Sequence, residues 1–206
     1  MLTVHHLGIS QSDRIVWLCE ELGIPYELVR YDRDPVTRLA PASYKALHPS
    51  GTAPVISDDD LVLAESGAII DYIVAKLGGG RLTLQSDHPD FAQFLYWYHF
   101  ANGSMMPCMM MLMAEGSVAE MMRDRANRNL VALNEHFAKG NQWLAGEEFT
   151  VADIMILFPL TTIRAFVPLD LSPYPHLRSY LKRAIARPAF QRAMAKADPD
   201  LQIPAD

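Results

Sequence analysis

One short segment, Ser50 to Val55, constrains the fold of this chain more than any other. It has the sequence Ser-Gly-Thr-Ala-Pro-Val, and Pro54 stands directly before the β-type run Val55–Ile56. Proline has no backbone N–H, so it belongs at the start or the edge of a strand. With a cis peptide bond at Pro54 the chain would turn sharply, and Val55 would offer its N–H and C=O groups to an extended peptide.

A second segment, Glu65–Ser66, follows the apolar run 61–63 and opens a helical pattern over 68–77. A serine at a helix N-terminus places a hydroxyl and free N–H groups where a carboxylate binds, and the neighbouring acid suits an ammonium group. Together the two segments indicate a site for a small peptide with charged ends. The simpler alternative is a strand–turn–strand–helix unit in which the serine only caps the helix.

The first 80 residues alternate between strand-like and helical patterns in the order β-α-β, short helix, β-β-α. The strand-like runs are 2–7, 26–31, 55–56 and 61–63, and the helical runs are the stretch up to 22, 43–47 and 68–77. Gly23 and Pro25 mark the end of the first helix. This order predicts an α/β thioredoxin-like fold, in which a cis-proline precedes the third strand.

The chain changes character near Gly78–Gly80. We predict a thioredoxin-like domain over residues 1–80, a linker over 81–88 and an all-α helical domain over 89–206. The predicted helices run from 91 past 113, over 117–139, from 150, over 175–186 and over 188–197. Gly103 and Pro107 are expected to bend the first of them. Thr150 and Asp153 have the spacing of a capping box, which supports the fold and indicates no particular substrate.

Composition excludes several classes of function. A formal net charge of −6 and the lack of a basic stripe argue against a nucleic-acid partner. The two cysteines, Cys19 and Cys108, are far apart and form no metal or redox motif. Charges or prolines interrupt every apolar stretch well before the roughly 20 residues that a membrane span needs. Because no signal peptide precedes the first strand, we expect a cytoplasmic protein.

Several segments make the chain resemble the cytosolic glutathione S-transferases, in particular the serine-type members of bacteria and fungi. The matching segments are 10–14, 20–27, 49–55, 65–66, 149–154 and 187–190, so the resemblance spans essentially the whole chain. It implies the glutathione S-transferase fold, with a thioredoxin-like N-terminal domain and an all-helical C-terminal domain. It also implies glutathione as co-substrate, no metal, and a homodimer.

Such an enzyme must favour the thiolate of glutathione, because an unperturbed cysteine thiol has a pKa of about 8.5 and the thiolate is the nucleophile. A hydroxyl at the turn after the first strand would donate a hydrogen bond to the sulfur. Ser10 is our candidate, since it precedes Arg14 by the four residues seen in serine-type members. Ser12 is the second candidate, although we expect it to cap the following helix.

The resemblance also implies the residues that bind glutathione. Val55, after Pro54, would form antiparallel backbone hydrogen bonds with the cysteinyl residue. Glu65 and Ser66 would hold the γ-glutamyl group. Thr52 and Lys45 lie where the family contacts the glycyl end, and Lys45 would neutralise the glycyl carboxylate because Thr52 carries no charge.

The second substrate is predicted only as a small apolar electrophile. The segment 105–113 holds six methionines, and Met105, Met109 and Met113 are candidates for an adaptable apolar pocket. The alternative, which we favour, is a core helix, because a helical methionine stripe belongs more often to a core than to a site.

Other functions fit the same residues. A glutathione-dependent peroxidase or disulfide-bond reductase would use the same thiolate as a conjugating enzyme. A non-catalytic protein would bind glutathione, another ligand or a protein partner without turnover. The presence of Ser10 together with Val55, Glu65 and Ser66 favours the transferase.

Overall fold

The computed structural model describes residues 1–203 of the chain. These residues form two compact units, one made of residues 1–81 with 188–202 and the other of residues 82–187.

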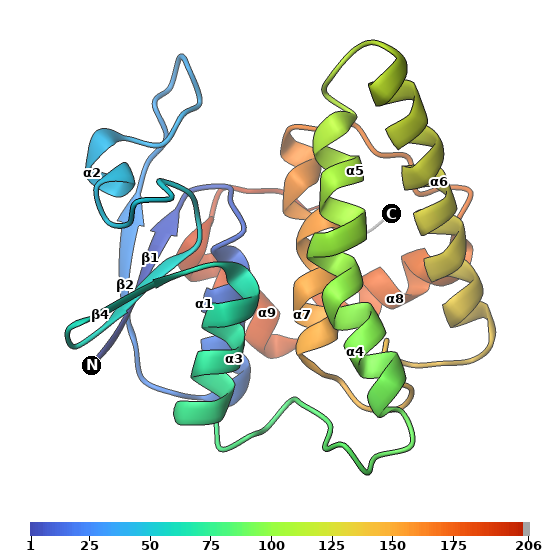
Figure 1. Ribbon diagram of the computed structural model, residues 1–206, viewed down its shortest axis with the longest axis horizontal. Coiled ribbons are helices and arrows are strands. Elements are labelled where there is room, and N and C mark those ends of the chain that lie inside the picture. The colour runs from blue at the N-terminus through green and yellow to red at the C-terminus, as the bar shows by residue number, and fades with distance from the viewer. Residues whose placement is uncertain (204–206) are drawn as a thin grey trace. The chain divides into compact units, whose positions relative to one another are not determined.

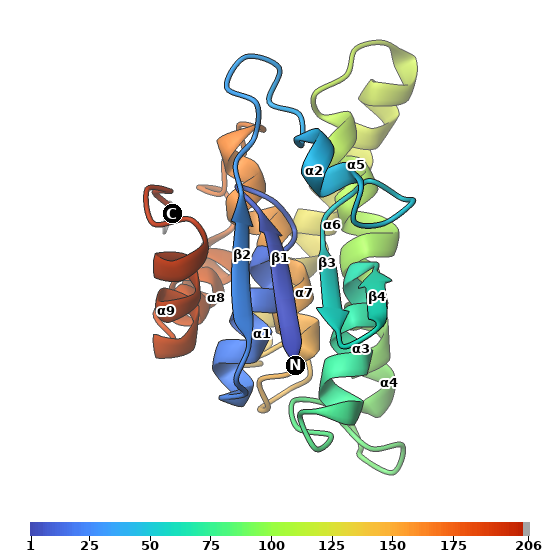
Figure 2. The ribbon, with the colours of Figure 1, turned by 90° about the vertical axis from the view of Figure 1, so that its left-hand side faces the viewer.

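The first unit is built on a four-stranded mixed sheet. Its strands are β1 (Leu2–Leu7), β2 (Glu27–Tyr31), β3 (Val55–Asp58) and β4 (Leu61–Ala64), in the spatial order β2-β1-β3-β4 (Figure 2). The pair β1–β2 is parallel, and the pairs β1–β3 and β3–β4 are antiparallel. With α1 (Asp13–Leu22), α2 (Ala42–Lys45) and α3 (Ser66–Lys76), the element order confirms the predicted thioredoxin-like fold.

Helices cover both faces of this sheet. Figure 1 shows α1 and α3 on one side and α2 on the other. Since side chains alternate along a strand, Val4 and its partner Ile56 point to the opposite face from Leu7. Leu7 packs with Val55 and with Tyr44 of α2. The two faces therefore form two apolar layers that fix the position of the turn between β1 and α1.

Two local predictions about the first unit are confirmed. The Ala53–Pro54 peptide bond is cis. Gly23 adopts the left-handed conformation, with φ 64°, and ends α1. A residue with a Cβ would be strained at that backbone conformation, which is why glycine stands there.

The last helix, α9 (Pro188–Ala197), belongs to the first unit and not, as the sequence division placed it, with the preceding helices. Phe190 contacts Trp17 of α1 edge to face, with 5.0 Å between the ring centroids. Arg192 Nε lies 3.0 Å from Glu20 Oε2, and Lys196 also pairs with Glu20. The predicted boundary differs because apolar periodicity shows that a helix has a buried face but does not show which helix covers it.

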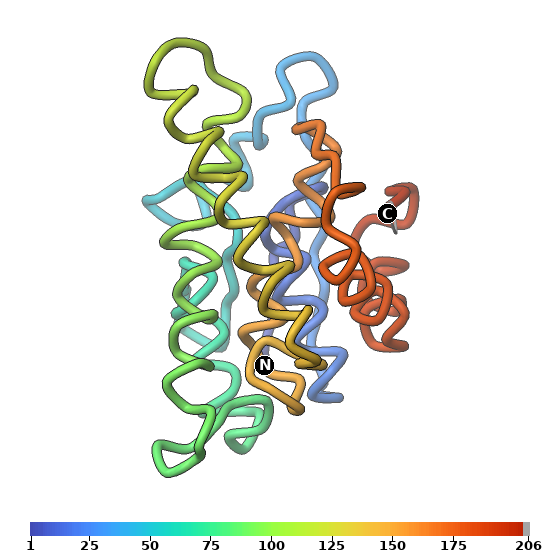
Figure 3. Tube along the Cα trace, turned by 90° about the vertical axis from the view of Figure 1, so that its right-hand side faces the viewer, coloured from blue at the N-terminus to red at the C-terminus, as the bar shows by residue number. Residues whose placement is uncertain are grey.

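The second unit is entirely helical, as predicted. It contains α4 (Phe91–Phe100), α5 (Met106–Met111), α6 (Ser117–Ala138), α7 (Val151–Leu157), α8 (Pro175–Ile185) and two short 3₁₀ turns, Phe158–Leu160 and Thr162–Ala165. A π-helical segment, Ala101–Met105, joins α4 to α5, where Gly103 was expected to bend the chain. Figure 3 follows the chain from α5 through a loop into α6, which packs against α5.

Candidate functional site

The two sequence segments that indicated a peptide site lie at the same end of the sheet. In the antiparallel pair β3–β4, Val55 is opposite Ala64. Pro54, just before β3, and Glu65, just after β4, therefore lie at the same end of this pair. Glu65 is exposed and has φ 75° and ψ 120°, a backbone conformation that residues with a Cβ rarely adopt. Such strained residues cost of order 1–3 kcal/mol and cluster at binding sites.

Ser66 begins α3 and is linked to α1. Its side chain is only 2% exposed, and its hydroxyl accepts a hydrogen bond from Arg14 Nη1 at 3.4 Å. The same Arg14 nitrogen donates to Gln11 Oε1 at 2.5 Å. Arg14 thus connects the turn after β1 to the start of α3, the two places where the sequence predicted ligand contacts.

Val55 is not in a position to bind a peptide through its backbone. It is 1% exposed and lies between two paired strands, opposite His5 on one side and Ala64 on the other. Ala53, on the other side of Pro54, precedes the paired residues, and its N–H and C=O have no hydrogen-bond partner among residues 1–203. At this end of the sheet, unpaired backbone polar groups are therefore found at Ala53, and Val55 lies within the paired strands.

The residues predicted for the glycyl end are exposed and lie near one another. Lys45 is the last residue of α2, and its Cβ and Cγ lie 3.8 Å from where a Cβ on Gly51 would be. Thr52 follows Gly51 and is exposed. A lysine ammonium group is therefore available near the loop that leads to Pro54.

Both candidate serines lie in the turn after β1, and both hydroxyls form internal hydrogen bonds. Ser10 is 4% exposed, and its Oγ donates to the Leu7 carbonyl oxygen at 2.6 Å. The Ser10 and Ser12 hydroxyl oxygens are 2.7 Å apart. Ser12 occupies the N-cap position of α1, but its side chain makes no capping hydrogen bond, contrary to our expectation. Its hydroxyl points inward, where it accepts from the Leu7 N–H at 3.2 Å.

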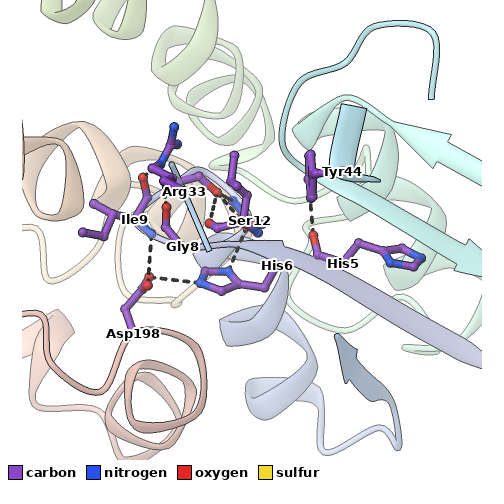
Figure 4. A network of polar contacts seen from close by, with 10 residues as sticks. His5, His6, Gly8, Ile9, Ser12, Arg33, Tyr44 and Asp198 are labelled. Atoms are coloured by element: carbon purple, nitrogen blue, oxygen red, sulfur yellow. Dashed lines mark hydrogen bonds and ion pairs between the residues drawn. The ribbon is translucent and has the colours of Figure 1, made fainter. Parts of the chain in front are cut away.

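Sequence reasoning missed a partner of Ser12. His6 is fully buried, with Nδ1 2.8 Å from Ser12 Oγ and Nε2 3.1 Å from Asp198 Oδ2, just after α9. Figure 4 shows His6 between Ser12 and Asp198, and His5 pointing away from them. No local signal could have found this contact, since 192 residues separate His6 from Asp198.

Neither cysteine is suited to act as a nucleophile. Burial raises the pKa of the Cys19 thiol to about 12, and burial also raises the pKa of Cys108. A raised pKa keeps both groups in the thiol form at neutral pH.

The methionine candidates do not form one surface. Met105 and Met109 are 0% exposed and belong to the core, whereas Met113 is 52% exposed. The core interpretation is therefore correct for Met105 and Met109, and the pocket proposed for the three together is wrong. Side chains three or four residues apart share a helix face, but the sequence does not say whether that face is buried.

Two absences hold for the part of the chain that the structure describes. Among residues 1–203 no three histidine, cysteine, aspartate or glutamate side chains are grouped so that they could hold a metal ion. None of the described helices is long and apolar enough to cross a bilayer.

Comparisons with known proteins bear on the family of the chain. The family model for the glutathione S-transferase N-terminal domain matches residues 10–76, and the model for the C-terminal domain matches residues 100–188. The chain is 30% identical to glutathione S-transferase 3 of Schizosaccharomyces pombe over 218 residues, which cover 96% of this chain and 88% of the relative. It is 29% identical to glutathione S-transferase GstB of Escherichia coli K12 over 192 residues, or 88% of this chain and 91% of that protein.

A solved structure gives the same result for the fold. A crystal structure of a glutathione S-transferase from Actinobacillus pleuropneumoniae matches with a TM-score of 0.87 and 32% identity, covering 96% of this chain and 93% of that one. Both family models, the curated relatives and the fold agree with the resemblance inferred from the sequence motifs. The chain belongs to the glutathione S-transferase family of enzymes.

Proposed function

We propose that this enzyme binds glutathione at the end of the sheet where Ala53, Glu65 and Ser66 lie. The enzyme then activates the thiol of glutathione for attack on a small apolar electrophile. The observation that carries the proposal is the start of α3, where the exposed, strained Glu65 precedes the hydroxyl and the backbone N–H of Ser66, the first residue of the helix. A carboxylate next to a helix N-terminus suits the ammonium and carboxylate groups of a γ-glutamyl residue.

The other contacts follow from the chemistry of glutathione. Ala53 offers backbone groups to the cysteinyl residue in the manner of an added strand. Lys45 lies near Gly51 and supplies the charge for the glycyl carboxylate. Ser10 donates its hydroxyl hydrogen to the sulfur once the proton of the thiol has left for solvent. A donated hydrogen bond favours the anion and lowers the pKa of the thiol.

A peroxidase or disulfide-bond reductase remains a second use of the same thiolate. Both protein cysteines are buried with raised pKa values, so such a reaction would form its mixed disulfide on glutathione and not on the chain. Assays with an alkyl or aryl halide, an organic hydroperoxide and a small disulfide separate the three reactions. Faster turnover of the halide than of the other two supports conjugation. We also propose a cytoplasmic location, where glutathione is reduced.

Replacing Glu65 or Ser66 by alanine is expected to weaken glutathione binding by roughly 10- to 100-fold, since hydrogen bonds to charged groups contribute about 1.5–3 kcal/mol. Isothermal titration calorimetry measures the Kd. Glu27→Ala is the matched control, because Glu27 is an exposed acid of the same unit, at the start of β2. Unchanged affinity in both site variants would remove the start of α3 from the site.

We also propose that the protein is a homodimer and that the outer face of α4 contributes to its interface. Leu95 and Tyr96 are exposed there, beside a shallow groove lined by Ala92, His99 and Gly103 among others. Contiguous exposed apolar side chains mark interaction surfaces.

Tyr96→Glu is expected to convert the dimer to a monomer, because it buries a charge in the interface. Light scattering after size-exclusion chromatography measures the mass. Val131→Glu on α6, also at an exposed apolar position, should leave the dimer intact. A wild-type monomer, or a Tyr96→Glu dimer, contradicts the proposal.

A further inference from the structure

We propose that Arg33 and Asp198 are positioning residues that hold Ile9 in a strained backbone conformation. Ile9 directly precedes Ser10 in the turn between β1 and α1, so its conformation determines where the Ser10 hydroxyl lies. This inference rests on the proposed function, because it takes Ser10 as the donor to the sulfur of glutathione. We call Arg33 and Asp198 the Ile9 clamp.

Ile9 has a backbone conformation that its own side chain disfavours. Its φ is 51°, in the left-handed region. A residue with a Cβ populates this region about tenfold less than the right-handed one, and a β-branched residue such as isoleucine is rarely found there. Such a conformation persists only where the surrounding structure enforces it, and it clusters at functional sites. The residue before the proposed thiol donor is therefore held by contacts from other parts of the chain.

The Ile9 clamp binds backbone polar groups on both sides of the Ile9 φ bond. Asp198 Oδ1 accepts from the Ile9 N–H at 3.0 Å, and Arg33 Nη2 donates to the Ile9 carbonyl oxygen at 3.2 Å. Arg33 Nε donates to the Gly8 carbonyl oxygen at 2.7 Å, and the Gly8 N–H donates to the Tyr31 carbonyl oxygen at 2.9 Å. In Figure 4 the backbone of Gly8 and Ile9 lies between Arg33 and Asp198. Rotation about φ would therefore break at least one of these hydrogen bonds.

The guanidinium group of Arg33 is suited to fix this rotation, because its donors form a rigid, planar fork. Nε and Nη2 bind two successive carbonyl groups, those of Gly8 and Ile9. Successive carbonyl groups of an extended chain point in opposite directions, so one edge of the fork could not bind both if Ile9 were extended. The third nitrogen, Nη1, donates to the Arg38 carbonyl oxygen at 2.9 Å and ties the fork to its own loop.

The clamp needs to fix only the position of the Ser10 oxygen. Ser10 Oγ lies 2.6 Å from the Leu7 carbonyl oxygen and accepts from the Ser12 N–H at 3.3 Å. A hydroxyl hydrogen rotates about its C–O bond, so it can turn from the Leu7 carbonyl to a sulfur while the oxygen stays in place. If Ile9 relaxed to negative φ, the Ser10 backbone would rotate with it and the oxygen would leave this position.

Arg33→Ala is expected to lower kcat by about tenfold, since the left-handed conformation of Ile9 then loses about tenfold in population. The thiolate absorbance of bound glutathione at neutral pH should fall as well. The Kd for glutathione from calorimetry should change little, because the clamp acts on the thiolate and not on the rest of the tripeptide. Arg33→Lys keeps the charge but lacks the fork, so it should lose nearly as much.

Arg30→Ala is the matched control. Arg30 is exposed, lines the same cavity of about 330 Å³ as Arg33, and acts on Asp198 through its charge. Its removal changes the local charge by the same amount and leaves the hydrogen bonds to Gly8 and Ile9 in place. Wild-type kcat in Arg33→Ala or Arg33→Lys, or an equal loss in Arg30→Ala, would overturn the proposal.

Second substitutions separate positioning from a merely structural role. Asparagine adopts the left-handed conformation several-fold more often than most residues, so Ile9→Asn should restore most of the thiolate lost in Arg33→Ala. Ile9→Val, which is also β-branched, should restore none of it. In a Ser10→Ala background, Arg33→Ala should cause no further loss of kcat, because the clamp acts through Ser10. Equal rescue by asparagine and valine, or a full additional loss in the Ser10→Ala background, would contradict this role.

A measurement without ligand covers the case in which the Arg33 variants fail to fold. In the nuclear magnetic resonance spectrum of the wild type, the amide and α hydrogens of Ile9 should show a strong mutual Overhauser effect, since they approach each other most closely at positive φ. A weak effect in the wild type would overturn the proposal. This spectrum is independent of the proposed function, which fails separately if the wild type binds no glutathione.

Discussion

Ser10→Ala is expected to lower kcat for conjugation by about 10²-fold, the loss typical of removing one hydrogen-bond donor from a developing or stabilised anion. The affinity for glutathione should change little, because the rest of the tripeptide is held by other residues. Steady-state kinetics with a chromogenic halide and calorimetry with glutathione measure the two quantities separately. The thiolate absorbance at neutral pH should fall together with kcat.

Ser12→Ala is the informative comparison, since the two hydroxyls are neighbours with different contacts. Ser12 is bonded to His6 Nδ1 and to the Leu7 N–H, so its loss should act on the sulfur only through Ser10. Ser43→Ala, at an exposed position of α2, serves as the neutral control. A larger loss of kcat in Ser12→Ala than in Ser10→Ala would assign the thiol donor to Ser12.

Much of the fold could be predicted because its signals are local. Gly23 ends α1 through its positive φ, Pro54 marks a strand start, and Thr150 caps α7, each recognisable from a few adjacent residues. The alternation of apolar residues likewise placed the strands. Local chemistry determines the elements and their ends, and these in turn position the start of α3.

The candidate site was predicted less completely, because its details depend on pairings between distant segments. The sequence could not distinguish Ala53 from Val55, since the choice depends on which residues β1 and β4 pair with. The contact of His6 with Asp198 depends on α9 packing against α1 within the first unit, which periodicity does not show. Ser12 occupies the N-cap position of α1, yet its hydroxyl forms hydrogen bonds with Leu7 and His6 and does not cap the helix.

The largest effect on stability is expected at Asp153 of the capping box. Its carboxylate is fully buried and accepts hydrogen bonds from the Thr150 N–H at 2.9 Å, the Leu144 N–H at 3.0 Å and the Tyr180 hydroxyl at 3.1 Å. Burial raises the pKa of Asp153 to about 6 in spite of these donors. The site therefore joins three segments of the second unit through one side chain whose charge is costly to bury.

Asp153→Ala should lower the free energy of unfolding by about 3–5 kcal/mol, because three buried donors lose their acceptor at about 1–3 kcal/mol each. Thr150→Ala removes the cap and the 3.4 Å hydrogen bond from the Thr150 hydroxyl to Asp153, and it should cost about 1 kcal/mol. Urea denaturation followed by circular dichroism measures both.

Since the folded pKa is raised, the proton is bound more tightly in the native state, and the stabilising contribution of Asp153 should decrease as the pH rises through about 6. The difference between wild type and Asp153→Ala should thus be larger at pH 5 than at pH 7.5 by about 1 kcal/mol. Equal losses in the two variants would mean that Asp153 stabilises the protein only through the cap.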